Sequence, residues 1–156
     1  MIFRNVLAAT LLVLAMSGTA LAQDPAKLVT KADVEKVTGA KFTDGTAPMD
    51  GQVAFAEDGG GLQISVELKA REAGATVRGW EATMKKMQPA TKVETVSGLG
   101  SDAIYYSTRA DLGKISADFE KPRVQMSVSV SGAKTPAQAR QVVTDLAKIA
   151  AARIGK

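Results

Sequence analysis

Two segments with the same alternating pattern constrain the fold of this chain more than any other feature. Residues 124–130 read VQMSVSV and residues 62–68 read LQISVEL, so apolar and polar side chains alternate in both. Alternation with a period of two is typical of a β-strand that buries one face and exposes the other. The sequence therefore predicts an antiparallel sheet with one apolar face and one polar face.

Three segments carry helix signals. Thr30 is a typical N-cap, Asp33 completes a variant of the capping box, and Gly39 is a suitable residue to end the helix. A second helix is expected over Ala75–Gln88, where apolar residues recur at helical spacing. A third helix follows Thr135, another N-cap, and has proline at its first position.

Six strands are expected between these helices, bounded by turn-rich segments. The resulting order, α-ββ-α-ββ-ββ-α, predicts an α+β fold in which helices pack on one face of an antiparallel sheet. The expected strands are Gln52–Ala56, Leu62–Lys69, Lys92–Val96, Asp102–Ser107, Lys114–Phe119 and Arg123–Val130.

The shift of 62 positions that aligns the two alternating segments also aligns the helices that follow them. Val77 and Trp80 of the second helix fall on Ala139 and Val142 of the third. Duplication of one strand-strand-helix unit explains this match. The alternative is that any two such units share the same spacing of apolar residues in their strands and helices. In either case each hairpin has one apolar face, and the two faces together can form a common core.

The N-terminus has the pattern of a secretory signal peptide. Arg4 precedes an apolar run over residues 6–16, and Ala20-Leu21-Ala22 is an A-x-A cleavage site. An uncleaved anchor is disfavoured because the run is shorter than the roughly 20 residues that span a bilayer. We expect cleavage after Ala22, a single domain over residues 23–156, no stable membrane anchor, and a periplasmic or secreted location.

The absence of cysteine and histidine excludes several classes of site. The chain can form no Ser-His-Asp or Cys-His arrangement, no Cys/His zinc site and no disulfide. The net charge of +4 falls to +3 when Arg4 leaves with the signal peptide, and lysine and arginine are scattered among the acidic residues. We therefore expect no cofactor and no nucleic-acid partner.

The polar face of the predicted sheet is the candidate binding surface. Hydroxyls and amides there can hold a polar ligand or a partner protein through many modest hydrogen bonds, although water alone often covers such a face. Ser107, Ser116, Asp118 and Ser129 are expected on the same face. The candidate site residues are Gln63, Ser65, Glu67, Tyr105, Gln125 and Ser127.

Two other features favour structural roles. Gly98 and Gly100 precede a strand, whereas phosphate-binding glycine loops precede a helix, so we interpret SGLG as a turn. Trp80, Met84 and Met87 have helical spacing, which favours packing in the core over a stripe that binds a partner. Exposure of Trp80 in the folded protein would favour the partner groove instead.

The order of elements around the stretch GLGSDAIYY (98–106) resembles that of a known group of proteins. The predicted order is a helix that ends in glycine, a hairpin, this stretch, a second hairpin and a final amphipathic helix. This order is similar to that of small exported lipoproteins and extracytoplasmic sensor-like domains of uncharacterised function. The resemblance covers most of residues 23–156. The lipid-bearing and paired cysteines often seen in that group are absent here, so membrane attachment and a disulfide-stapled cleft are not implied. The resemblance implies a non-catalytic sensing or binding role and identifies no site residues.

Three classes of function follow from these observations. The first is a non-catalytic, exported binding or sensor-like module for a protein or a polar small molecule. The second is an assembly protein that pairs through edge strands or the last helix, with a homodimer as one form. The third is a carboxylate-based hydrolase, for which the spacing brings no acid and base together. Its candidate carboxylates are Asp44, Asp50, Glu57, Asp58, Asp102, Asp111 and Asp118.

Overall fold

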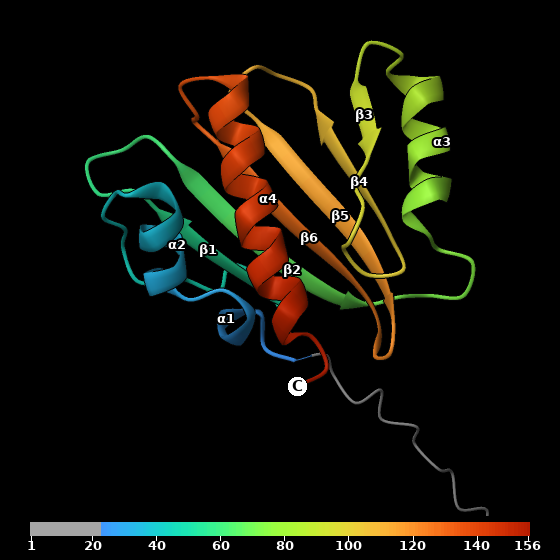
Figure 1. Cartoon of the computed structure of the whole chain (residues 1–156), viewed down its shortest axis with the longest axis horizontal. Coiled ribbons are helices and arrows are strands. Elements are labelled where there is room, and N and C mark those ends of the chain that lie inside the picture. The colour runs from blue at the N-terminus through green and yellow to red at the C-terminus, as the bar shows by residue number, and fades with distance from the viewer. Residues whose placement is uncertain (1–22) are drawn as a thin grey trace, which may run out of the picture.

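The structure is a computed structural model that describes residues 23–156 (Figure 1). Four helices and six strands follow one another in the predicted order, with one additional short helix at the start. The helices are α1 (Pro25–Leu28), α2 (Lys31–Thr38), α3 (Val77–Met87) and α4 (Pro136–Arg153). The strands are β1 (Gln52–Ala56), β2 (Gln63–Ala70), β3 (Lys92–Thr95), β4 (Asp102–Ser107), β5 (Gly113–Glu120) and β6 (Arg123–Ser131).

All six strands form one antiparallel sheet in the order β1-β2-β6-β5-β4-β3. The predicted α+β class is therefore confirmed. The two predicted hairpins, β1–β2 and β5–β6, lie side by side because β2 pairs with β6, and Val66 stands opposite Val128. The two alternating segments thus form the centre of the sheet.

The main core lies between one face of the sheet and α4, which crosses the strands in Figure 1. The alternate apolar residues of β2 and β6 are buried there, and α1 and α2 close the core beside α4. The largest fully buried side chains of this core include Leu28, Val34, Phe42, Ile64, Ile115, Met126 and Leu146. Because no disulfide is present, this core has to supply most of the stability.

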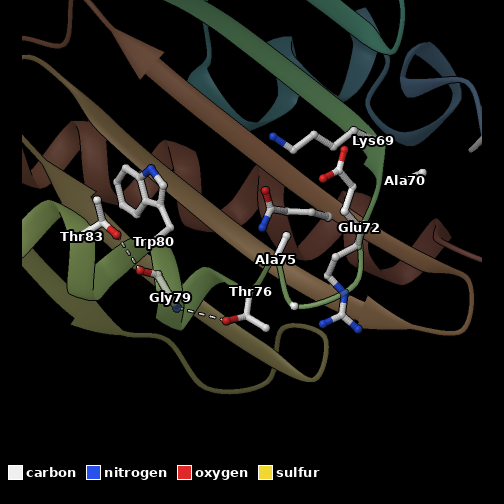
Figure 2. A pocket seen from close by; sticks show the side chains of 11 residues that line it. Lys69, Ala70, Glu72, Ala75, Thr76, Gly79, Trp80 and Thr83 are labelled. Carbon is white, nitrogen blue, oxygen red and sulfur yellow. Dashed lines mark hydrogen bonds between the residues drawn. The ribbon is translucent and has the colours of Figure 1, made fainter.

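Helix α3 lies on the other face of the sheet. The prediction that the helices pack on one face holds for α1, α2 and α4 and is wrong for α3. The physical reason is a small apolar patch on the otherwise polar face, formed by Ile104, Tyr106 and Val93, which Val77 and Trp80 of α3 cover. In Figure 2 α3 lies in front of the strands and α4 passes behind them.

The strand pairing has the same register in both hairpins. Val53 pairs with Val66, and 62 positions later Ile115 pairs with Val128. The helices do not repeat in this way, since α3 and α4 pack on opposite faces. Internal duplication therefore stays a hypothesis that rests on the strands.

The predicted signal peptide occupies residues 1–22 and lies outside the described residues. Within residues 23–156 no helix combines the length and the apolar character that crossing a membrane requires. Gln23 lies beside the last residue of α4, because its side-chain amide donates to the carbonyl oxygen of Arg153 at 2.8 Å.

An ion pair joins α2 to the end of α4. The predicted capping box is confirmed, with Asp33 accepting from the backbone N–H of Thr30 at 2.9 Å, and Arg153 donates to the same carboxylate. The Arg153 hydrogen bond is the main cause that lowers the pKa of Asp33 from 3.8 to about 2. The pKa in the folded protein lies below that of the unfolded chain, so the pair stabilises the fold fully above about pH 4.

We predict that Arg153→Met lowers the free energy of unfolding by about 1 kcal/mol at pH 7, a value that allows for partial exposure of the pair. The difference from the wild type should shrink as the pH falls from 4 to 2, because Asp33 then becomes protonated in the folded state too. Urea unfolding across this pH range measures it, with Lys148→Met on the same helix as control. A difference that stays constant down to pH 2 contradicts the prediction.

Candidate ligand groove between α3 and the sheet

A groove of about 470 Å³ opens between α3, residues 71–76 and the ends of β2 and β6. We call it the outer groove, and Figure 2 shows its lining side chains. Trp80 and Thr83 line it from α3, and Lys69 lines it from β2. The remaining lining residues are Ala70, Arg71, Glu72, Gly74, Ala75, Thr76, Gly79 and Gln125.

A smaller space of about 80 Å³, the inner cavity, lies between α3 and the polar face of the sheet. It shares Lys69, Trp80 and Gln125 with the outer groove, so these three side chains stand between the two spaces. Its other lining residues are Glu67, Val77, Tyr106, Lys114, Ser116 and Ser127. We call the two spaces together the recess, in which α3 contributes Trp80 and Thr83 and the sheet contributes mostly polar side chains.

Trp80 is the central aromatic residue of this recess. Its ring packs against Tyr106, with 4.4 Å between ring centroids and an angle of 42° between the planes. The Trp80 side chain is half-buried rather than enclosed, and Met87 is 72 % exposed. The predicted core position is therefore wrong for Met87, whereas Trp80 packs on the small apolar cluster under α3 and keeps part of its surface open.

A buried carboxylate determines where α3 begins. Asp118 on β5 is 2 % exposed and accepts from the backbone N–H of Val77, the first residue of α3, at 2.9 Å. It also accepts from the Gln125 amide at 3.0 Å, and a guanidinium nitrogen of Arg71 lies 3.9 Å away. Arg71 in turn donates to Glu120. Asp118 thus ties β5, β6 and the segment that leads into α3 to one point.

The inner cavity is rich in hydroxyl groups. The Ser116 and Ser127 hydroxyls are 2.9 Å apart and bond to each other. Burial is the main cause that raises the pKa of Tyr106 to about 12, so its hydroxyl is neutral at physiological pH. The Lys114 ammonium lies 5.8 Å from the centroid of the Tyr106 ring. These hydroxyls can donate and accept hydrogen bonds.

Of the six candidate site residues, Glu67, Gln125 and Ser127 line the inner cavity. Gln63 and Ser65 lie further along β2, in a separate shallow depression of about 280 Å³. These five share the polar face of the sheet, as their pairing register shows.

The predicted place of Tyr105 on the polar face is wrong. It lies on the α4 face, packed in the main core, and the guanidinium carbon of Arg140 lies 4.7 Å from its ring centroid. The reason is the apolar patch under α3, which takes Ile104 and Tyr106 and so turns Tyr105 to the opposite face.

Sequence reasoning did not name Lys69, Tyr106, Lys114 or Gly79 as residues of a binding site, although all of them line the recess. Lys69 and Lys114 continue the alternation of β2 and β5, so extending the polar face along each strand would have identified them. Tyr106 and Gly79 carry no such signal, and Trp80 fits both an apolar core stripe and a stripe that binds a partner.

No protein-family model, curated protein or solved structure matches this chain. The resemblance to exported sensor-like domains therefore stays a prediction. Within residues 23–156 no group of three or more acidic side chains is arranged to hold a metal ion.

We predict that Asp118→Ala lowers the free energy of unfolding by about 3 kcal/mol. The change leaves the buried Arg71 with one fewer anion and the first N–H of α3 without its acceptor. Urea unfolding measures the loss. The control is Asp58→Ala, at an exposed carboxylate in the β1–β2 turn. Its free energy of unfolding is expected to stay within about 0.5 kcal/mol of the wild type. A loss below about 1 kcal/mol at Asp118 contradicts its anchoring role.

Proposed function

We propose that this protein is a non-catalytic binding module whose polar small-molecule ligand occupies the outer groove and reaches the inner cavity. Half-buried Trp80 supplies apolar contact area, while Thr76, Thr83 and Gln125 supply hydrogen-bonding groups. A mostly apolar concave surface with a few polar groups is the usual chemistry of a ligand site. The proposal agrees with the role that the resemblance implies.

Gly79 is the observation that carries the proposal. It lies in the first turn of α3 and lines the outer groove, and a Cβ atom there would meet only Thr76 Oγ1, at 3.4 Å. Its φ angle is not positive, so neither the backbone nor the packing demands glycine. Glycine in a helix is less stable than alanine by about 0.5–1 kcal/mol. Its presence keeps the wall of the groove free of a side chain.

The proposed module acts in the periplasm or outside the cell. The pattern of residues 1–22 supports this location, with Ala22 as the last residue of the signal peptide. All the lining residues named for the proposed ligand site lie within residues 23–156.

The alternative functions have less support. An assembly role through α4 is disfavoured because its apolar stripe is buried against the sheet. The sheet has two edge strands, the short β3 and β1, and the bridges Phe42–Glu57 and Thr46–Ala54 cover part of the β1 edge. For a hydrolase, the spacing in the sequence brings no acid and base together, and the structure places Asp102 opposite Asp118 on the neighbouring strands β4 and β5. Each carboxylate, however, has its own partners: Arg78 donates to Asp102 at 2.6 Å, and Val77 and Gln125 donate to Asp118. This pair anchors α3 and offers no free acid and base.

Two substitutions at Gly79 test the proposal, one through stability and one through ligand binding. Gly79→Ala is expected to raise the free energy of unfolding by about 0.5 kcal/mol. Gly79→Leu is expected to fill the groove and abolish ligand binding while the protein stays folded. Native mass spectrometry with the small-molecule extract of the source organism measures binding as an adduct of one ligand per chain.

The control is Gln141→Ala, at an exposed position of α4 on the other side of the sheet, which is expected to keep the adduct. An adduct that survives Gly79→Leu unchanged would place the ligand elsewhere and contradict the proposed groove. The absence of any adduct on the wild type would contradict the binding module itself.

A further inference from the structure

We propose that the ligand is a neutral oligosaccharide that lies along the polar face of the sheet, from the recess at Trp80 to the depression beside Gln63. This inference rests on the proposed function and adds the chemical class and the extent of the ligand. We call the whole surface the polar strip, and it consists of the outward-facing residues of β2 and β6 between those two ends.

The pairing of β2 and β6 places the residues of the polar strip in one row, in which Ser127 is 6 % exposed. Ser65 stands opposite Ser129, Glu67 opposite Ser127, and Lys69 opposite Gln125. The last two pairs line the inner cavity, and Ser65 and Ser129 line the shallow depression. From Gln63 to Lys69 the strip is about 20 Å long at 3.4 Å per residue, which is the length of several pyranose rings.

The chemistry of the strip is that of hydroxyls and amides. The depression has no charged side chain in its lining, and its polar residues are Thr43, Thr46, Gln63, Ser65, Ser129 and Ser131. Each of these groups can both donate and accept a hydrogen bond, and so can every hydroxyl of a sugar. A chain of sugar hydroxyls can therefore satisfy such a surface without any ionic contact.

The charges at the recess end are of both signs, with Lys69, Arg71 and Lys114 beside Glu67 and Glu72 in the lining. Glu67 and Lys69 lie 4.0 Å apart on the strip and offset each other. The Arg71 guanidinium is engaged with Glu120 and lies close to Asp118. A nucleic acid or another polyanion needs a cluster of uncompensated cations, which this face lacks among the described residues.

Trp80 supplies the feature that separates a sugar from other neutral ligands. One part of its indole packs on Tyr106 and the rest lines the outer groove. An aromatic face can pack against the apolar C–H face of a pyranose ring while the ring's hydroxyls point to the sheet. Gly79 beside it places no side chain on this wall of the outer groove.

The test uses the emission of Trp80, the only tryptophan in the sequence. The protein is titrated with cellohexaose, chitohexaose and maltohexaose, with glucose and N-acetylglucosamine as single-ring comparisons. We expect a saturable change in emission with at least one hexasaccharide, and affinity at least tenfold weaker for its single ring. A hexamer of galacturonic acid and a neutral Gly-Ser hexapeptide are expected to give no saturable change.

The variant Gln63→Ala/Ser129→Ala tests the far end of the strip. Both residues line the depression away from Trp80, so loss of about two hydrogen bonds should weaken hexasaccharide binding about tenfold. Binding of the corresponding disaccharide at Trp80 should not change. Gln141→Ala is the matched control and is expected to bind like the wild type.

The outcomes separate this inference from the proposed function. If no neutral oligosaccharide binds but the extract adduct still depends on Gly79, the groove is a ligand site and the oligosaccharide assignment is wrong. Equal affinity for the galacturonic acid hexamer or the peptide also overturns the assignment. If hexasaccharide affinity is unaffected by Gln63→Ala/Ser129→Ala, the ligand does not extend along the strip.

Discussion

The buried carboxylate of Asp118 is the interaction on which the arrangement of this protein most depends. Asp118 lies on β5, and its oxygens accept from the first N–H of α3 and from Gln125 on β6, close to Arg71. Removal of any one partner leaves an unpaired polar group in a dry environment, which is unfavourable by a few kcal/mol. The carboxylate therefore holds α3 on the polar face, where hydrophobic contact alone is limited to five residues.

The sheet consequently has two different faces. One is covered by α4, α1 and α2 and forms the main core, as the alternation of β2 and β6 requires. The other is covered only near β4 and β5, where Val77 and Trp80 of α3 pack on Ile104 and Tyr106. A helix that covers part of a polar face leaves a recess along its side, and the proposed ligand site is that recess. The proposed binding role thus depends on incomplete coverage of the sheet.

The local signals in the sequence predicted the elements well because each acts over a few residues. The caps at Thr30 and Thr135 and the strand alternation correspond to observed helix starts and strands. The face of β4 was not predictable in this way, because in the run Ile104-Tyr105-Tyr106 either set of alternate residues can face a core. The side on which α3 packs was equally open, since a stripe such as Val77/Trp80 does not say which apolar patch it covers.

The candidate site was predictable to a similar extent. The alternation correctly placed Gln63, Ser65, Glu67, Gln125 and Ser127 on one surface. It did not reveal that Trp80 stands beside Glu67, Gln125 and Ser127. That contact depends on the buried Asp118, which the sequence shows only as one more polar residue of a strand.

The contact between Trp80 and Tyr106 tests the central claim most directly, because the recess exists only if α3 packs on the polar face. Proton–proton nuclear Overhauser effects of the Trp80 indole in isotope-labelled protein can measure it. The structure predicts strong effects to the Tyr106 ring, which lies 4.4 Å away between centroids, and none to Leu146 of α4. Effects from the Trp80 indole to Leu146 or to Val128 in the main core would contradict the arrangement and, with it, the ligand groove.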